Sequence, residues 1–131
     1  MSGVRRLNAG SPWEGVVGYS RVVVRGDAAW VSGITSTVDG VVIHPGDAGA
    51  QTREALRILK QALERAGFSL NDVVRTRIFV TDISRWEEIG RAHGEVFGDV
   101  RPASSMLQVS ALIDPEMLVE IEADAVRGAG A

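Results

Sequence analysis

The stretch Val119-Glu120-Ile121-Glu122-Ala123-Asp124-Ala125-Val126 alternates between apolar and acidic side chains over most of its length. A period of two predicts a β-strand with one apolar face and one face that carries a row of carboxylates. Antiparallel sheets commonly leave one face in water, which explains the charges as a solvated surface. If a neighbouring subunit covers that face, a buried glutamate there is a candidate general base or proton relay. Both interpretations of the acidic face stay open on the sequence.

Further strands are predicted upstream of this one. They are expected at 21–25 and 29–33 around a turn at Gly26-Asp27, at 41–43, at 73–80 and at 103–111, and the final strand itself is expected over 118–126. The strand 73–80 is rich in β-branched residues, and one of its faces is expected to carry Val74, Thr76, Ile78 and Val80.

Two helices separate these strands. Apolar residues at three- and four-residue spacing predict a helix over 47–66 with Gly67 as its C-terminal cap. Ser84-Arg85-Trp86-Glu87 matches a capping box that begins a second helix, which ends at Gly98. The residues expected to be buried on the second helix are Ile89, Ala92, Val96 and Phe97. The order of elements predicts an α+β fold in which both helices pack on one face of a mixed sheet.

Length and composition predict one domain over residues 1–131, with 128–131 as a frayed tail. The chain has 131 residues, 45% of them hydrophobic, and 14 Lys+Arg against 17 Asp+Glu give a net charge of −3. The acidic balance disfavours nucleic acid as a partner, because phosphate binding depends on clustered positive charge. No apolar run reaches the length of a membrane span and no signal-peptide pattern is visible, so a cytoplasmic protein without a membrane partner is expected.

Residues that carry common chemistries do not form a known motif in this chain. The lack of cysteine excludes thiol nucleophiles, CxxC redox pairs and iron–sulfur ligation. His44 and His93 lack metal-ligand spacing, so no metal site and no cofactor are expected. Ser104 and Ser105 are not set in a GxSxG elbow, and the glycines form neither GxGxxG nor a P-loop. Motifs therefore assign no activity.

Five short segments, spread over nearly the whole chain, nevertheless form a specific set through their order and spacing. They are Gly18-Tyr19-Ser20, Val31-Ser32-Gly33, Phe79-Val80-Thr81-Asp82, Arg101-Pro102-Ala103 and the final strand 119–126. On these segments the chain resembles the RidA/YjgF family of enamine and imine deaminases, also described as the endoribonuclease L-PSP type. The resemblance implies a chorismate-mutase-like α+β fold, assembled as a homotrimer around an inner barrel with clefts between the subunits.

The resemblance also implies roles for four residues. Glu120 matches the glutamate that positions the hydrolytic water in members that deaminate. Tyr19, Ser32 and Gly33 match residues that line the cleft of the family. A small-molecule ligand is therefore expected to bind between subunits.

The chain departs from the family pattern at the arginine that grips the substrate carboxylate. Ser104 stands at this position, and Met106 stands where the family often has cysteine. A serine hydroxyl supplies neither the charge nor the fork geometry of a guanidinium. Arg101 and His93 are candidate auxiliary residues. The resemblance therefore places the chain in an Arg-lacking branch, with absent or weak activity toward 2-imino acids.

Three functions follow from these observations. The first is a trimeric protein whose intersubunit clefts bind a neutral or weakly polar metabolite, with Glu120-assisted hydrolysis of an enamine, an imine or a related carbonyl compound. The second is a non-catalytic ligand-binding or regulatory trimer that uses the same cleft. The third is the ribonuclease or translation-inhibitor activity under which some family members are named, which the acidic balance disfavours. Whether the chain is an enzyme stays open between the first two.

Overall fold

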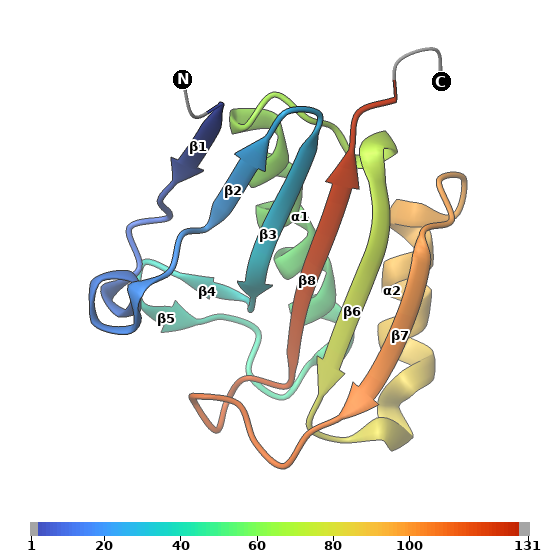
Figure 1. Cartoon of the computed structure of the whole chain (residues 1–131). Coiled ribbons are helices and arrows are strands. Elements are labelled where there is room, and N and C mark those ends of the chain that lie inside the picture. Colours follow the sequence, from blue (N-terminus) through green and yellow to red (C-terminus); the bar gives the residue numbers. More distant parts are fainter. Residues whose placement is uncertain (1–2, 129–131) are drawn as a thin grey trace.

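A computed structural model describes residues 3–128 of the chain. Six strands form one mixed sheet, and two helices cover one of its faces (Figure 1). The sheet is built from β1 (Val4–Leu7), β2 (Val22–Arg25), β3 (Ala28–Ile34), β6 (Val73–Val80), β7 (Ala103–Gln108) and β8 (Val119–Val126). The helices are α1 (Ala48–Arg65) and α2 (Trp86–Phe97). The predicted α+β architecture with a mixed sheet is confirmed.

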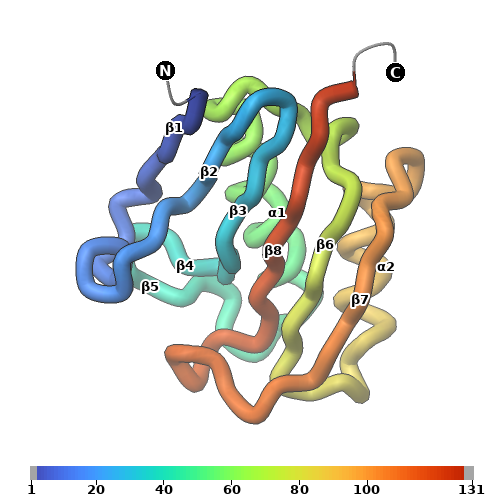
Figure 2. Tube along the Cα trace, viewed as in Figure 1, coloured from blue at the N-terminus to red at the C-terminus, as the bar shows by residue number. Residues whose placement is uncertain are grey.

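The strands are arranged in the order β1-β2-β3-β8-β6-β7. Only β6 and β7 pair in parallel, and every other neighbouring pair of this sheet is antiparallel. A separate two-stranded hairpin, β4 (Thr37–Val38) with β5 (Val41–Val42), follows β3 and lies beside its end (Figure 2). No helix of residues 3–128 has the length and apolar character needed to cross a membrane.

The core lies between the helices and the covered face of the sheet. Leu56, Leu59 and Leu63 of α1 are buried against the apolar face of β8, as the alternating pattern predicts. Burying one such leucine contributes about 2 kcal/mol. Asp47 caps the N-terminus of α1 by accepting a hydrogen bond from Ala50 N at 2.9 Å, and the helix ends before Gly67, whose φ of +87° suits glycine.

The start of α2 differs from the predicted capping box at Ser84. The carboxylate of Asp82 accepts hydrogen bonds from Ser84 N at 3.0 Å and from Ser84 Oγ at 2.6 Å. A carboxylate placed two residues before an N–H closes such a turn more readily than a hydroxyl does. A 3₁₀ turn (Ile83–Arg85) therefore precedes the helix, which begins at Trp86. Val96 is half-buried rather than buried.

Two strands also differ from their predictions. In β6 a register shift opposite β8 between Val73 and Arg75 leaves Val74 exposed, so Val73 takes its place in the core. The strand predicted over 103–111 ends at Gln108. β1 was not predicted, because exposed Arg5 and Arg6 interrupt its apolar pattern. Of the predicted frayed tail, only Gly128 lies within the described residues.

Candidate functional site

A β-bulge at Ser32-Gly33 shapes the end of β3. Val31 pairs with Ala123 and Ile34 pairs with Ile121, so two residues of β3 lie opposite the single residue Glu122. The extra residue turns the strand locally and re-aims its carbonyl groups. Both residues of the bulge line a cavity.

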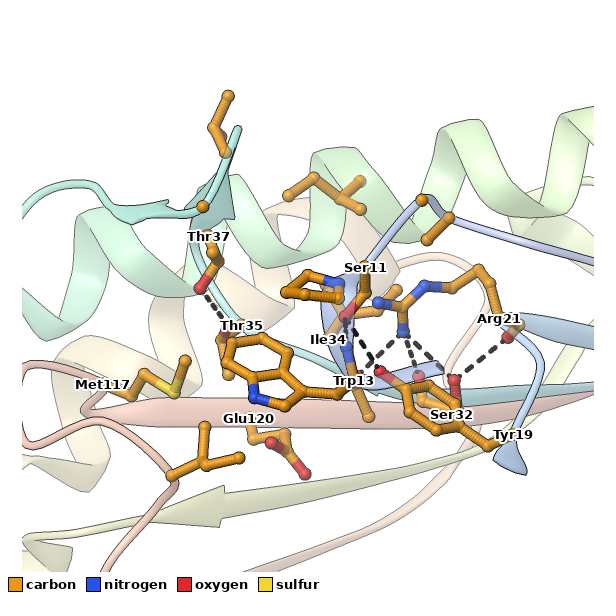
Figure 3. A pocket seen from close by; sticks show the side chains of 18 of the residues that line it. Ser11, Trp13, Tyr19, Arg21, Ser32, Ile34, Thr35, Thr37, Met117 and Glu120 are labelled. Atoms are coloured by element: carbon orange, nitrogen blue, oxygen red, sulfur yellow. Dashed lines mark hydrogen bonds between the residues drawn. The ribbon is translucent and has the colours of Figure 1, made fainter. Parts of the chain in front are cut away.

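A cavity of about 540 Å³ opens at this end of the sheet (Figure 3). Its volume lies within the range of small-molecule sites. It is lined by residues of the loop before β2, the bulge, the β4–β5 hairpin, α1 and the approach to β8: Ala9, Gly10, Ser11, Pro12, Trp13, Val17, Tyr19, Arg21, Ser32, Gly33, Ile34, Thr35, Thr37, Val38, Asp39, Gly40, Arg57, Ile58, Gln61, Ile113, Met117 and Glu120.

Glu120 presents an unbonded carboxyl group to this cavity. The side chain is half-buried, and within residues 3–128 neither carboxyl oxygen has a hydrogen-bond partner. Burial raises the pKa of Glu120, and the nearby charge of Glu122 adds to the rise, while Arg21 opposes it. A carboxyl group with a raised pKa and free oxygens is suited to bind water and exchange a proton with it.

Gly33 makes room for this carboxyl group. A Cβ atom built at Gly33 would lie 2.3 Å from Glu120 Oε2, which is too close for any real contact. The backbone of Gly33 is not in the left-handed region, so the requirement for glycine here is one of space. The predicted cleft residues Gly33 and Glu120 are therefore in direct apposition.

We expect Gly33→Ala to displace the Glu120 carboxyl group and to lower ligand affinity and any turnover by at least about tenfold, since 1 Å of misplacement is costly in a catalytic site. The fold should persist, because only a side-chain end must move. Titration calorimetry and circular dichroism would measure both. Gly94→Ala is the control, because its new methyl group would meet nothing within 4 Å. Equal affinity of the two variants would contradict the expectation.

Arg21 is a cavity residue that the sequence analysis missed. Its Nη1 donates to Gly33 O at 2.8 Å, to Ser32 O at 3.0 Å and to Ser32 Oγ at 3.2 Å, so it braces the bulge. Burial lowers the pKa of Arg21, yet a guanidinium stays charged throughout the working range of pH. The sequence feature that could have indicated Arg21 as a site residue is its place directly after Tyr19-Ser20, where an apolar strand begins.

Tyr19 and the loop before it close the cavity on one side. The Tyr19 hydroxyl donates to Ser11 Oγ at 3.3 Å. Glu14 accepts from Ala9 N and Ser11 N, each at 2.8 Å, and thereby folds the loop. Four of the predicted site residues, Tyr19, Ser32, Gly33 and Glu120, thus meet in one cavity.

The other predicted site residues lie elsewhere in the chain. Ser104 and Met106 are on the edge strand β7, in register with Thr76 and Ile78 of β6. Their side chains project toward the helix-covered side of the sheet, whereas Glu120 projects from the opposite face. Ser104 is exposed at this edge and Met106 packs against the core. A single chain therefore does not bring Ser104 and Met106 to Glu120.

A hydrogen-bonded row links Ser104 to His93. Thr76 Oγ1 donates to Ser104 Oγ at 2.8 Å and lies 2.9 Å from His93 Nε2. Burial lowers the pKa of His93, which keeps the imidazole neutral at pH 7. Arg101 lies apart from this row, with its Nε donating to Gly98 O at 2.9 Å. Within residues 3–128 no three metal-ligating side chains lie together.

These features define a small α+β protein with one helix-covered sheet face and a cavity that holds an unbonded acid beside a half-buried cation. The Endoribonuclease L-PSP family model matches residues 11–127. The chain therefore belongs to the RidA/YjgF family.

Individual relatives agree with this assignment. A solved structure of a YjgF-family member from Mycobacterium tuberculosis superposes with a TM-score of 0.86 at 51% identity, covering 95% of this chain and 99% of that one. An uncharacterized protein of Streptomyces coelicolor is 37% identical over 96% of this chain and 94% of its own. The 3-aminoacrylate deaminase RutC of Acinetobacter baylyi is 42% identical over 61% of this chain and 63% of its own.

Proposed function

We propose that the protein binds a small metabolite in clefts between the subunits of a homotrimer and hydrolyses an enamine, an imine or a related carbonyl compound with the help of Glu120. The observation that carries the proposal is the half-buried carboxyl group of Glu120, which has a raised pKa and no hydrogen-bond partner within residues 3–128. The similarity to a named deaminase supports the same reaction class. We place the protein in the cytoplasm.

The distribution of the site residues supports a site between copies. One group, with Glu120, lines the cavity, and the other, with Ser104, lies on the edge strand β7. All β7 residues except Met106 are exposed, and an exposed edge strand is a natural place for a second chain to pack. A neighbouring copy that covers this edge would bring the two groups together.

The open face of the sheet supports assembly as well. Arg77 on β6 lies 3.2 Å from Glu122 and 3.6 Å from Asp124 on β8, so part of the acidic row is paired. Trp30 on β3 is 47% exposed on the same face. A large exposed aromatic side chain beside paired charges suits an interface between copies of the chain. An inner barrel built from three such faces fits these features.

The reaction that Glu120 would assist is a hydrolysis with a simple balance. Water adds to the carbon of a C=N bond while the carboxylate accepts a proton from that water. The protonated carboxyl group then returns this proton to nitrogen, which gives a carbinolamine. The carboxylate next takes the proton of the new hydroxyl group and passes it to the same nitrogen, so that the C–N bond breaks and ammonia leaves. A carbonyl compound remains. A pKa raised toward neutrality suits a group that must both accept and return a proton.

The alternative is a non-catalytic ligand-binding or regulatory trimer that uses the same cavity. Ser104 at the position of the family's arginine favours this alternative, because the usual carboxylate anchor is missing there. For the same reason we expect weak or no turnover of 2-imino acids. The acidic net charge of −3 disfavours the ribonuclease function.

We expect a solution mass of about 42 kDa, three times the chain mass of 14.0 kDa, by light scattering at micromolar concentration. The trimer should release ammonia from at least one imine generated in situ by an oxidase. A mass near that of one chain would contradict both the trimer and the proposed site between subunits. A trimer that binds ligands but releases no ammonia from any imine would favour the regulatory alternative.

A further inference from the structure

We infer that Arg21 is an anion-binding residue of the cavity, and that the protein selects small ligands whose carboxylate pairs with this guanidinium. The inference rests on the proposed function only for the location of the ligand. It assigns the charge that the ligand carries and the side of the cavity from which the ligand is held.

The first argument is that Arg21 is a cation without an ionic partner. Within residues 3–128 Arg21 forms no ion pair, and among the arginines of this range that form none it alone is half-buried, since the others are exposed. Its guanidinium is also one of the more buried, and burial lowers its pKa. Removing a cation from water without a partner is costly. An anion that enters the cavity would offset this cost.

The second argument is that the protein leaves donors of Arg21 unused. The three hydrogen bonds of the side chain all come from Nη1. Nε is buried and has no partner, and Nη2 has no partner within residues 3–128. Figure 3 shows the guanidinium directed into the cavity, with its dashed bonds running from a single nitrogen. Because Nη1 is anchored, the guanidinium is already oriented for an incoming carboxylate.

The third argument concerns the spacing between Arg21 and Glu120. Both groups contact the same residue: Arg21 Nη1 lies 2.8 Å from Gly33 O, and Glu120 Oε2 lies 2.3 Å from the position that a Cβ of Gly33 would take. A ligand held by the guanidinium therefore lies beside the carboxyl group of Glu120.

Arg21 does not occupy the position that the family's arginine would take. Ser104, which stands at that position, belongs to the edge strand β7 and projects from the opposite face of the sheet. Arg21 precedes β2 and reaches the cavity beside Tyr19. A carboxylate held by Arg21 is therefore bound from a different side of the cavity than one held at the position of the family's arginine. The expected weakness toward 2-imino acids concerns turnover and stays a separate prediction.

The test compares an acid with its neutral counterpart on the full-length protein. Titration calorimetry at pH 7 would use 2-oxobutanoate and 2-oxobutanamide, which differ in charge but little in shape. We expect the acid to bind at least tenfold more tightly than the amide. Arg21→Gln should weaken binding of the acid at least tenfold, to about the level of the amide. Arg53→Gln is the matched control, because Arg53 is exposed and paired with Glu95 outside the cavity, and it should leave both affinities unchanged.

Three results would overturn the inference: equal affinity for acid and amide, unchanged affinity for the acid in Arg21→Gln, or no binding of the acid at millimolar concentration. If circular dichroism shows that the Arg21→Gln variant is unfolded, the Arg21→Lys variant is used in its place. We then expect at least a fivefold loss for the acid, because an ammonium cannot keep the anchored fork, and an unchanged affinity would overturn the assignment.

The ammonia-release assay separates this inference from the proposed function. If the acid binds through Arg21 but no imine is hydrolysed, the hydrolysis proposal fails and the inference stands. If a neutral imine is hydrolysed and the acid has no preference, the inference fails and the hydrolysis proposal stands.

Discussion

Glu120→Gln should lower turnover of a hydrolysable imine by at least about 100-fold while leaving the fold intact. The amide keeps the shape of the side chain but cannot accept a proton from water, and general base catalysis commonly contributes 10²- to 10⁴-fold. No hydrogen bond within residues 3–128 involves the Glu120 carboxyl group, so the substitution breaks none there. Ammonia release from the in situ imine is the measurement.

The same substitution should raise thermal stability at neutral pH. The folded state raises the pKa of Glu120 above its value of 4.5 in the unfolded chain, so folding binds extra protons between the two values. Stability is therefore lost as pH rises from 4.5 through the folded pKa. Glutamine removes that loss. The unfolding temperature of the variant should exceed that of the wild type at pH 7, and the difference should vanish below pH 4.

Glu122→Gln is the matched control for the effect on turnover. Glu122 lies two residues further along β8 on the same face, but its carboxylate is paired with Arg77 at 3.2 Å. We expect turnover to change by only a few-fold. Loss of turnover in Glu122→Gln together with full turnover in Glu120→Gln would show that the wrong acid has been assigned.

Gln51→Leu should cost about 3 kcal/mol of unfolding free energy, since each buried polar group left without a partner costs about 1–3 kcal/mol. Gln51 is fully buried on α1. Its Nε2 donates to Glu116 O at 2.9 Å and to His44 O at 3.2 Å, and its Oε1 accepts from Leu118 N at 2.8 Å. Leucine would leave Glu116 O and Leu118 N without these bonds, whereas His44 O would keep its bond from Asp47 N. The side chain also holds the segment that carries Met117 into the cavity.

Urea unfolding would measure the loss as a shift of the midpoint at constant slope. Gln61→Leu is the control, because it makes the same change on the exposed side of the same helix. Its effect should stay within about 0.5 kcal/mol. A difference of less than 1 kcal/mol between the two variants would mean that water or a rearranged loop replaces the bonds of Gln51.

Local periodicity was enough to predict most of the elements. The alternation over 119–126, the turn at Gly26-Asp27 and the apolar spacing of 47–66 are each encoded within a few consecutive residues. The structure contains β8, the β2–β3 hairpin and α1 at these places. Val74 was misplaced because a bulge shifts the register by one residue, which sends a side chain to the other face.

The site was less predictable because it depends on pairing between distant strands. Glu120 reaches the cavity through its strand, but its apposition to Gly33 follows from the bulge in the β3–β8 pairing. Arg21 enters the site because its side chain meets the carbonyl groups of that same bulge. Ser104 lies apart from both because β7 pairs with β6 in a particular parallel register. No short stretch of the sequence encodes any of these strand registers.

The place of β8 in the sheet has a consequence for how the protein is made. β8 comes last of the strands in the chain but lies between β3 and β6, and it alone joins the β1-β2-β3 half of the sheet to the β6-β7 half. During synthesis the earlier strands emerge with two unsatisfied edges facing each other. The sheet closes only after residues 119–126 have left the ribosome, so these edges are exposed to aggregation until then. Glu120 arrives with that closing strand, and the acid of the cavity is therefore among the last groups to reach its place.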